Sequence, residues 1–446
     1  MLRTHYSVEI TGTMDKELVT LAGWVHELRD IGRLKFLLLR DRKGIIQVTM
    51  SKKDVPEEVF KAVTTLSRES VVQVEGRVRA SNIAPRGVEI IPINLRVISR
   101  AKTPLPMDIA GKVRDHSGAV RDAGLDTRLD HRVIDLRKPQ VASIFYLRHI
   151  VLRAIHHFFD ERNYVEVQTP NLISAASEGG TGLFPVQYFE KKVFLAQSPQ
   201  LYKQMLMATG FDRVYEVTPY FRAEEHNTVR HLNELTGVDA EIAYISSEEE
   251  VMTELEELLS CVVDTTIEVG GEYLEKLGVE LTPLKTPLPR LTYKKAVELL
   301  QEEGYNIIFG EDLDTKAEKI LGRIMMEKTG CKAYFITRFP SSMSKFYTQV
   351  CTDDPDVSTH FDLEYGGMEV ASGNQRVHDM ETLKNRIISS GLNIDDFSYY
   401  LEAFEFGMPP HGGFGLGLDR LLMQLLKLGN IREATLFPRD RDRVTP

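Results

Sequence analysis

The chain has 446 residues, 42% of them hydrophobic and 27% charged, which are the proportions of a globular protein with two or three domains. Its formal net charge of −10 argues against a nonspecific nucleic-acid binder. No apolar run reaches the roughly 20 residues of a membrane helix, and the first residues lack the apolar core of a secretory signal. The three cysteines, Cys261, Cys331 and Cys351, fit neither a zinc site nor a disulfide framework. We therefore expect a cytoplasmic protein without a membrane partner.

Residues 1–103 are expected to form one domain. Alternating apolar residues predict five strands and one helix; the strands are expected at 19–25, 35–39, 45–50, 70–79 and 88–98, and the helix at 56–63. This order is that of a five-stranded OB-fold β-barrel, whose usual cargo is single-stranded nucleic acid. Residues 1–100 hold 17 Lys and Arg against 12 Asp and Glu, a net charge of +5 that leaves −15 for the remainder. The excess favours contact with a polyanion, although an ordinary fluctuation in surface charge gives the same count.

Residues 104–135 are expected to form a linker or hinge. Pro104 and Pro106 mark a boundary after the last predicted strand, and three glycines among charged residues follow them. The rest of the chain, residues 136–446, is expected to form one larger domain.

The larger domain is expected to begin with a long helix, because apolar residues recur at helical spacing from residue 139 to residue 162. A short strand and Pro170 follow. Amphipathic helices at 247–261 and 292–304 then predict a helical insertion at about residues 246–330, to which the sequence assigns no role beyond packing.

Two arginine-containing stretches carry the clearest chemical signal. Residues 221–231 read FRAEEHNTVRH after a strand-like segment, and residues 411–420 read HGGFGLGLDR. The four glycines of the second stretch let a flat or phosphorylated ligand approach the backbone, and Arg420 is suited to bind a polyphosphate. Taken alone, each stretch is also typical of an ordinary turn followed by a helix.

Together, in this order and separated by a long insertion, the two stretches resemble motifs 2 and 3 of the class II aminoacyl-tRNA synthetases. The helix at 139–162 with its strand and proline resembles motif 1, which implies a closed two-fold homodimer. The barrel resembles the anticodon-binding domain of the aspartyl-, asparaginyl- and lysyl-tRNA synthetases, and residues 432–440 close the chain in the manner of that family. The resemblance implies an α+β multidomain fold in which the barrel precedes a catalytic domain, an antiparallel sheet flanked by helices.

Residues 197–204, QSPQLYKQ, narrow the resemblance to aspartyl-tRNA synthetases, and the compact length is similar to that of the archaeal type. In this family Lys203 and Arg376 would bind the side-chain carboxylate of L-aspartate, and asparagine would leave both cations unpaired. Asp239 would hold the α-amine. An exposed lysine on a helix is the alternative interpretation of Lys203. The remaining residues implied at the aspartate pocket are Glu178 in a glycine-rich loop, Gln200, Arg222 and Ser372.

The same resemblance implies an ATP site in which Arg222, Glu369 and Arg420 are the catalytic residues. Arg222 would clamp the α-phosphate, and Arg420 would lie over one face of the adenine. Arg230 and His231 would steady the outer phosphates. The ATP-binding positions carried over from the motifs are Arg222, Ala223, Glu224, Arg230, His231, Leu232, Glu369, Gly417, Leu418, Asp419 and Arg420.

A magnesium site is implied at Asp362, Glu369 and Ser372. Their hard oxygens suit Mg²⁺, which takes the rest of its shell from water and phosphate. Surface acids are commoner than metal ligands, so the interpretation depends on the motif.

The implied reaction has two steps and needs no protein nucleophile in the first, because its difficulty is to bring anions together. L-aspartate and ATP give aspartyl-adenylate and pyrophosphate, and a ribose hydroxyl at the 3′ end of tRNA-Asp then takes the aspartyl group. Residues 343–345, Met-Ser-Lys, resemble part of a class I synthetase loop, but no partner motif accompanies them and we interpret them as a coincidence. Phe346 and Tyr347 are expected to line the pocket.

Two pairs of residues in the barrel are expected to read tRNA. By the family pattern Phe36 stacks on the middle anticodon base and Gln47 binds its edge; the alternative is that Phe36 belongs to the core and Gln47 faces solvent, and we expect Trp24 in the core. His26 and Pro85 match positions that are His and Pro in relaxed archaeal enzymes and Trp and Lys in strict ones. We therefore predict a non-discriminating enzyme that also charges tRNA-Asn for a separate amidotransferase, unless His26 and Pro85 are an ordinary strand residue and turn.

Three other functions compete with this one. An asparaginyl-tRNA synthetase is disfavoured by Lys203, because those enzymes usually have a non-basic residue there. A catalytically inactive tRNA-binding paralogue is disfavoured because the motif arginines and acids are all present. A relative of the aspartate–ammonia ligases is disfavoured because that group lacks an OB domain.

Overall fold

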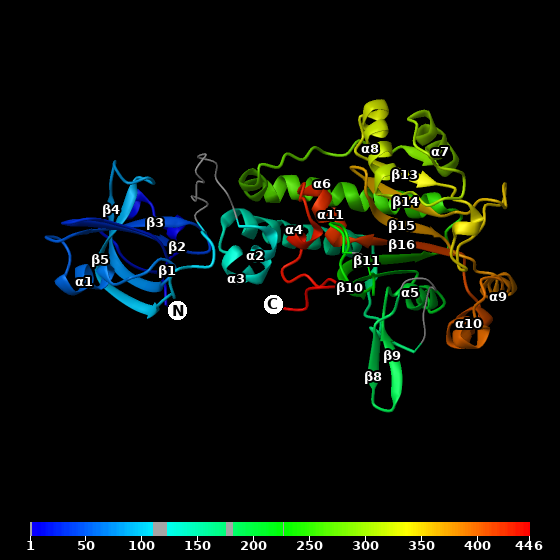
Figure 1. The fold of residues 1–446 in the computed structure, drawn as a ribbon, viewed down its shortest axis with the longest axis horizontal. Coiled ribbons are helices and arrows are strands. Elements are labelled where there is room, and N and C mark those ends of the chain that lie inside the picture. Colours follow the sequence, from blue (N-terminus) through cyan, green and yellow to red (C-terminus); the bar gives the residue numbers. More distant parts are fainter. Residues whose placement is uncertain (1, 110–122, 175–181, 226) are drawn as a thin grey trace. The chain divides into compact units, whose positions relative to one another are not determined.

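The computed structural model describes residues 2–109, 123–174, 182–225 and 227–446. The chain divides into two compact units, a first unit of Met1–Gly124 and a second unit of Leu125–Pro446, each with its own apolar core (Figure 1). Residues 110–122 of the expected hinge and Glu178 in the expected glycine-rich loop lie outside the described residues.

The first unit is a closed barrel with the strand order β1-β2-β3-β5-β4, which confirms the OB-fold prediction. Along β2 the side chains alternate, so that Leu37 and Leu39 fill the barrel while Phe36 and Leu38 are half-buried on its outer face. The elements are the short helices η1 (Ser7–Glu9) and η2 (Gly12–Met14), strands β1 (Leu18–Ile31), β2 (Leu34–Arg40) and β3 (Ile45–Ser51), helix α1 (Glu57–Thr64), and strands β4 (Val71–Ala80) and β5 (Val88–Ser99).

Strand β1 is longer than the predicted 19–25 because it changes partner. It pairs with β4 up to Trp24 and with β2 from Trp24 onward, with a β-bulge between Val25 and Glu27. From His26 onward its residues are half-buried or exposed on both faces. The apolar alternation that supported the prediction therefore ends before the strand does.

The second unit is built on an eight-stranded sheet with the order β12-β13-β14-β15-β16-β11-β10-β6. The six central strands pair antiparallel, as expected, and only the two edge pairs, β12 with β13 and β6 with β10, are parallel among the described strands. The strands are β6 (Val165–Glu166), β10 (Arg213–Phe221), β11 (Glu234–Ala243), β12 (Arg290–Thr292), β13 (Ala333–Thr337), β14 (Phe361–Tyr365), β15 (Glu369–Gln375) and β16 (His411–Gly417). A separate small sheet has the order β7-β9-β8, with β7 (Leu172–Ile173), β8 (Pro185–Tyr188) and β9 (Lys191–Leu195).

Two long helices, α4 (Pro139–Glu161) and α6 (Glu248–Leu277), and the short helix α11 (Leu418–Leu425) form the main core with the sheet. A second core joins α5 (Gln200–Met207), α9 (Met380–Ser389) and α10 (Ser398–Glu405), with the short helix η4 (Ile394–Phe397) between α9 and α10. Helices α7 (Tyr293–Glu302) and α8 (Thr315–Thr329) pack at the β12–β13 edge (Figure 1). The remaining short helices are α2 (Leu125–Asp130), α3 (Arg132–Asp135), η3 (Ser341–Met343) and η5 (Ile431–Ala434).

Residues 125–135, expected in the linker, form α2 and α3 of the second unit. Arg132 is only 1% exposed and donates hydrogen bonds of 2.9 Å to the carbonyl oxygens of Thr435 and Leu436. A buried arginine of this kind is not visible in the composition of a segment, which is why prolines and glycines alone suggested a linker.

Helix α6 runs through two adjacent glycines, although its predicted part ended at residue 261. A Cβ atom on Gly270 would lie 2.6 Å from Cδ2 of Leu147 in α4, whereas one on Gly271 would meet nothing within 4 Å. Gly270 therefore lets the two long helices approach closely, and α6 ends only at Gly278, whose φ of 65° is left-handed.

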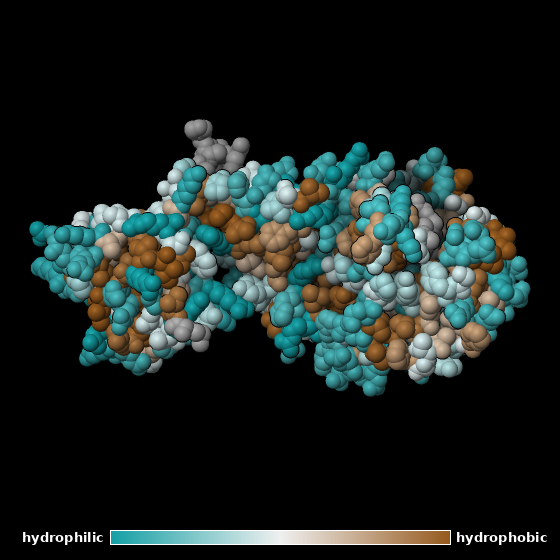
Figure 2. Space-filling model, turned by 90° about the horizontal axis from the view of Figure 1, so that it is seen from below, coloured by the Kyte–Doolittle hydropathy of each residue, from teal (hydrophilic) through white to brown (hydrophobic). Residues whose placement is uncertain are grey.

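No helix in the described part of the chain is long and apolar enough to cross a membrane. The face in Figure 2 is a mosaic of teal and brown residues. Large apolar side chains are exposed singly, such as Ile83 at 97% and Phe406 at 80%, and scattered residues of this kind are normal on a protein surface.

The contact of α4 with α6 gives a first prediction. Gly270→Leu should lower the free energy of unfolding by about 1–3 kcal/mol, because the added side chain must displace Leu147. Gly271→Ala is the matched control and should raise it by about 0.5–1 kcal/mol, since alanine is the better helix former. Thermal unfolding followed by circular dichroism measures both, and an unchanged midpoint for Gly270→Leu would show that the helices are not in tight contact.

Candidate active site

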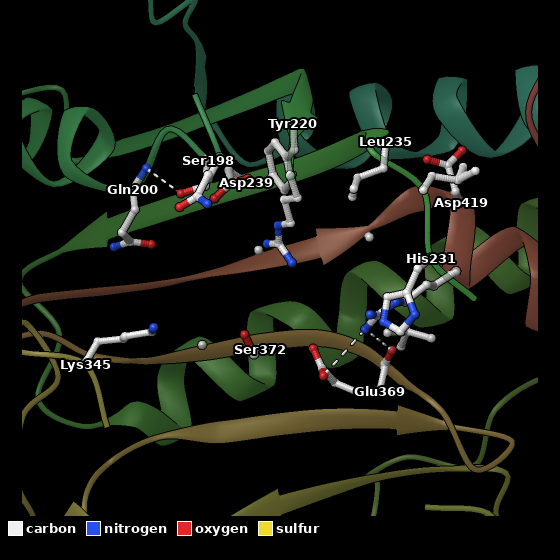
Figure 3. A pocket seen from close by; sticks show the side chains of 18 of the residues that line it. Ser198, Gln200, Tyr220, His231, Leu235, Asp239, Lys345, Glu369, Ser372 and Asp419 are labelled. Atoms are coloured by element: carbon white, nitrogen blue, oxygen red, sulfur yellow. Dashed lines mark hydrogen bonds and ion pairs between the residues drawn. The ribbon is translucent and has the colours of Figure 1, made fainter. Parts of the chain in front are cut away.

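A cavity of about 300 Å³ lies on the sheet between β10, β11, β15 and β16. In the view of Figure 3, Ser198, Gln200, Asp239 and Lys345 lie toward one end and His231, Glu369 and Asp419 toward the other, with Tyr220 and Ser372 between them. The lining residues are Gln197, Ser198, Gln200, Tyr220, Arg222, Glu224, Arg230, His231, Leu232, Leu235, Asp239, Lys345, Tyr347, His360, Glu369, Val370, Ser372, Gly373, Asn374, Arg376, Gly415, Gly417, Asp419, Arg420 and Ile431.

Glycines keep the floor of this cavity open. A Cβ atom on Gly415 would lie 3.4 Å from the carboxylate of Asp239, and one on Gly237 would lie within the ring of Tyr220 at 1.9 Å. The ring of Tyr220 therefore packs directly on the backbone of β11 and supports Arg222, whose guanidinium lies 5.8 Å from the ring centroid.

Four buried charges meet at one end of the cavity. Nζ of Lys203 lies 2.8 Å from Oδ1 of Asp239 and 3.3 Å from Oε2 of Glu241, and it donates to the carbonyl oxygen of Phe414 at 2.9 Å. Arg376 donates Nε and Nη2 to the two carboxylate oxygens of Glu241 at 2.8 and 3.0 Å. Its Nη1 donates to Oδ1 of Asn374 at 2.6 Å. Two cations and two carboxylates give this charge cluster no net charge.

The surroundings shift the pKa values of Glu241 and of His411 beside it. Burial opposes the ionisation of Glu241, but the charges of Arg376 and Lys203 outweigh it and hold the pKa of the carboxyl below its usual range. Burial also lowers the pKa of the neighbouring His411 to about 4, so this imidazole is neutral at pH 7 and donates from Nδ1 to the carbonyl oxygen of Pro409 at 2.9 Å.

Basic residues line the other end of the cavity. Arg222, Arg230 and Arg420 all line it, and Nη1 of Arg420 donates to the carbonyl oxygen of Glu369 at 3.3 Å. His231 lies 3.6 Å from Glu224, and Arg230 forms an ion pair with Glu318.

The expected ATP positions of motif 3 divide between cavity and core. Gly417 and Asp419 line the cavity, while Leu418 is fully buried in the main core. The carboxylate of Asp419 pairs with Arg148 of α4 and accepts from the backbone N–H of Thr236 at 2.7 Å, so it ties α11 to two neighbouring elements. Near motif 2, Leu232 lines the cavity, and the N–H of Ala223 donates to the carbonyl oxygen of Gly182 at 3.0 Å.

The expected magnesium ligands lie on β14 and β15. Asp362 is the cross-strand partner of Ser372, and Glu364 is the partner of Glu369. Glu369 and Ser372 are three residues apart, so strict alternation would place them on opposite faces of the sheet. Leu363 pairs with Ala371 and Glu364 with Glu369, so Val370 is the extra residue of a β-bulge in β15, and this bulge brings all four to one face.

This face gathers several acidic side chains, and their crowding opposes ionisation. Burial raises the pKa of Asp362, and the charge of Glu369 adds to the rise while His360, 3.1 Å away, opposes it. Burial and three neighbouring carboxylates raise the pKa of Glu364 well above its usual range, and burial raises the pKa of Glu318 to about 6. Within the described residues, no three His, Cys, Asp or Glu side chains are arranged as a complete metal site. The oxygens of Asp362, Glu369 and Ser372 nevertheless fit a hard cation whose shell phosphate completes, because such a cation would relieve their mutual repulsion.

In the first unit, the predicted anticodon residues share the outer face of β2 and β3. Nε2 of Gln47 donates to Oγ1 of Thr49 at 3.1 Å and to Oε2 of Glu89 at 3.0 Å, which leaves its carbonyl oxygen as the acceptor for a ligand. Glu89 is 5% exposed and also accepts from Arg79. Phe36 is half-buried on the outer face.

The two expected discrimination residues have different surroundings. The ring of His26 hydrogen-bonds through Nδ1 with Nη1 of Arg40 at 2.9 Å, and burial and Arg40 lower the pKa of His26. Pro85 is exposed in the turn between β4 and β5. Trp24, expected in the core, is half-buried with Arg40 5.9 Å above its ring.

Some residues of the cavity had no part in the sequence-based interpretation. Lys345, dismissed there as a coincidence, lines the cavity with Tyr347, and its amino group points into it (Figure 3). Phe346, expected to line the cavity, instead packs in the second core against Phe397 and Tyr400. Glu241, two residues after Asp239 on β11, was also missed, because the strand carries other acids and nothing in the sequence separates Glu241 from them.

The neutral, buried His411 gives a second prediction. The pKa of its imidazole is depressed from about 6.5 to about 4 on folding, so the unfolded chain binds a proton below pH 6.5 that the folded chain does not. Stability should fall as the pH decreases from 6.5 to 4. At pH 5 this residue alone should cost about 2 kcal/mol relative to pH 7. His411→Asn, whose amide can still donate to Pro409, should lose less stability over this range, and parallel curves of thermal midpoint against pH would contradict the prediction.

Comparison with protein families matches both units. Residues 124–441 match the model for tRNA synthetases class II (D, K and N), and residues 19–98 match the OB-fold nucleic acid binding domain.

Relatives match over the whole chain. It is 53% identical to the aspartate–tRNA(Asp) ligase of Pyrococcus abyssi and 52% identical to the aspartate–tRNA(Asp/Asn) ligase of Methanopyrus kandleri, in each case over 446 residues and 100% of both chains. Among solved structures, asparaginyl-tRNA synthetase from Pyrococcus horikoshii complexed with asparaginyl-adenylate superposes with a TM-score of 0.92 at 33% identity over 100% of both chains. A putative aspartyl-tRNA synthetase from Leishmania major has a TM-score of 0.91 at 30% identity over 100% of this chain and 95% of the other.

A class II sheet that carries the arginines of motifs 2 and 3, an OB-fold barrel ahead of it, and full-length relatives at this identity together show that the chain belongs to the class II aminoacyl-tRNA synthetases and, within them, to the family of aspartate–tRNA ligases.

Proposed function

We propose that this protein ligates L-aspartate to tRNA-Asp, and also to tRNA-Asn, through an aspartyl-adenylate formed from ATP. The observation that carries the proposal is one cavity in which a buried charge cluster at one end faces three arginines at the other. A dipolar amino acid and a polyphosphate are the ligands that these two ends match.

Charge balance at the cluster end favours aspartate over asparagine. Lys203 and Arg376 are matched by Asp239 and Glu241, and Lys345 adds positive charge to the cavity wall at this end. L-aspartate brings a net charge of −1 and gains from that wall, whereas neutral asparagine gains less. Asp239 would hold the α-ammonium group, Lys203 and Arg376 would face the side-chain carboxylate, and Gln200 and Ser372 would complete the pocket. Glu178, outside the described residues, would close it.

At the other end Arg222, Arg230, His231 and Arg420 would bind the triphosphate, with Glu224 at the adenine. An oxygen of the aspartate α-carboxylate attacks the α-phosphorus, the bond to the bridging oxygen breaks, and pyrophosphate leaves. A ribose hydroxyl of the tRNA 3′ end then attacks the acyl carbon, and AMP leaves. Arg222 and Arg420 would stabilise the charge on the phosphates, so positioning and electrostatics carry the catalysis.

Mg²⁺ is proposed at Asp362, Glu369 and Ser372. When bound there, it would neutralise phosphate charge beside the arginines. The support is the shared face that the β-bulge creates and the raised pKa values of its carboxyl groups.

The first unit is proposed to read the anticodon. Phe36 offers a ring for stacking, and Gln47 offers its carbonyl oxygen to a base donor such as N3–H of uracil, because its amide N–H groups are held by Thr49 and Glu89. Glu89 is then a positioning residue. It was absent from the sequence-based interpretation.

The proposal that tRNA-Asn is also charged rests on His26 and Pro85, the two residues expected to set discrimination between the tRNAs. Relatives named for both tRNA-Asp and tRNA-Asn occur at 52% identity beside relatives named for tRNA-Asp alone at 53%, so overall similarity does not decide between them. If tRNA-Asn receives aspartate, a separate amidotransferase must convert it. We further propose a cytoplasmic homodimer, on the resemblance of α4 and the strand after it to motif 1.

An asparaginyl-tRNA synthetase is the second candidate, since such an enzyme superposes on this chain. The lysine of the buried cluster and the lower identity of 33% favour aspartate.

The test of the proposed function is aspartylation of purified tRNA-Asp and tRNA-Asn transcripts, with asparagine as the control amino acid. Both transcripts should accept aspartate. His26→Trp combined with Pro85→Lys should reduce charging of tRNA-Asn about tenfold and spare tRNA-Asp, because one lost discriminating contact is worth about that factor. Charging of tRNA-Asp alone by the unaltered protein would remove the relaxed assignment. Charging with asparagine would replace the aspartate assignment.

The positioning role of Glu89 gives a further prediction. Glu89→Gln should raise the KM for tRNA about tenfold, because the new amide no longer fixes the orientation of Gln47. Pyrophosphate exchange, which needs no tRNA, should not change. Glu57→Gln removes the same charge from an exposed pair on α1 and is the matched control. Equal KM values for the two variants would refute the role.

A further inference from the structure

The end of the chain folds back over the loop of motif 2. After α11, the segment from Asn430 to Arg443 runs beside residues 227–231 (Figure 1, red). The backbone N–H of Ile431 donates to the carbonyl oxygen of Val229 at 2.8 Å, and that of Asn233 donates to the carbonyl oxygen of Arg439 at 2.9 Å. Residues 432–440 had no role in the proposed function beyond closing the second unit.

Arg432 joins this segment to the loop. Its side chain is almost fully buried, and Nε donates to Oδ2 of Asp440 at 2.5 Å. Nη2 donates to Oδ1 of Asn227 at 2.5 Å, and Nη1 donates to the carbonyl oxygen of Thr228 at 3.0 Å. One guanidinium therefore holds the end of the chain and two successive loop residues in a fixed geometry.

Asn227 is held from both sides. Its Nδ2 donates to Oδ2 of Asp442 at 2.5 Å, while its Oδ1 accepts from Arg432. Asp440 orders the segment that carries Asp442, because its Oδ1 accepts from the backbone N–H groups of Asp442 and Arg443 at 2.9 and 2.8 Å. Asp442 can thus hold Asn227 only in this folded form of the chain end.

The loop leads from these contacts into the cavity. Oγ1 of Thr228 lies 2.6 Å from Nδ1 of His231, and His231 lines the cavity with Arg230. Asn227, Thr228 and Val229 are themselves exposed. A loop with so little buried surface has low local stability on its own, so the contacts from the chain end must supply its order.

We propose that the C-terminal segment from Arg439 to Arg443 acts through Arg432 and Asn227 as a positioning device for His231 and Arg230. The inference rests on the proposed function, in which these two residues meet the outer phosphates of ATP. Without the contacts from the chain end, the loop would have to become ordered when ATP binds, and this ordering would reduce the binding free energy. The affinity for ATP should then fall, while the aspartate end of the cavity stays as it is.

The test exchanges the side chains of Asn227 and Asp442, which are exposed hydrogen-bond partners. Asn227→Asp places a carboxylate against Asp442 and should raise both the dissociation constant of ATP with Mg²⁺ and the KM for ATP about tenfold. The double variant Asn227→Asp with Asp442→Asn restores a complementary pair, because the new carboxylate accepts from Arg432 and from the new amide. It should return both constants to within about twofold of the unaltered protein. The KM for aspartate should stay constant throughout.

Asn306→Asp, at an exposed asparagine between α7 and α8, is the matched control and should leave all constants unchanged. Calorimetry measures ATP binding without requiring the reaction, and pyrophosphate exchange gives the KM values. Wild-type ATP affinity in Asn227→Asp, or no recovery in the double variant, would overturn the inference. A variant with a lower thermal midpoint, a lower affinity for ATP and a higher KM for aspartate would also overturn the inference, because these changes together indicate general damage to the fold. Normal ATP binding without aspartate-dependent exchange in the unaltered protein would count against the proposed function only.

Discussion

The ion cluster of Lys203, Asp239, Glu241 and Arg376 is the constraint on which the cavity depends. Each of these side chains is at most 3% exposed, and a buried charge without a partner costs several kcal/mol. Every member therefore needs its neighbours in place. The members come from α5, β11 and the residue that follows β15, so the cluster fixes one helix against the centre of the sheet. The cluster itself adds no net charge to the cavity wall, so the other cations of the wall discriminate ligands by the charge that each ligand brings.

The sheet builds the rest of the cavity by local departures from regularity. Glycines at positions 237 and 415 make room for an aromatic ring and a carboxylate. Between β14 and β15, Gly366 and Gly367 with φ of 61° and 77° form the tight turn before the β-bulge. Regular strands supply the rigid frame, and these few positions decide which side chains reach the ligand.

Much of this arrangement could be predicted from the sequence. Alternating apolar residues gave the order of the barrel strands, and the motif arginines pointed to a cavity that Arg222, Arg230 and Arg420 do line. What could not be predicted depends on contacts distant in the chain. Glu241 reads as one acid among 65 Asp and Glu until the fold places it between Lys203 and Arg376. The predicted part of α6 ended at residue 261, and the close packing of Gly270 on Leu147 of α4 is a contact that the sequence does not show. Lys345 was set aside because its short motif has no partner motif in the sequence, and only the fold shows that it lines the cavity.

Because of the β-bulge beside the acidic face, the number of residues in the β14–β15 hairpin matters more than the identity of each residue. A substitution at Glu369 removes one oxygen ligand. Deletion of one residue from the hairpin would instead restore strict alternation, turning Glu369 away from Asp362 and Ser372 and exposing the apolar residues that now pack inward. The spacing between Asp362 and Ser372 is therefore a property of the hairpin as a whole, and the loss of any one residue would disturb the acidic face more than the exchange of one.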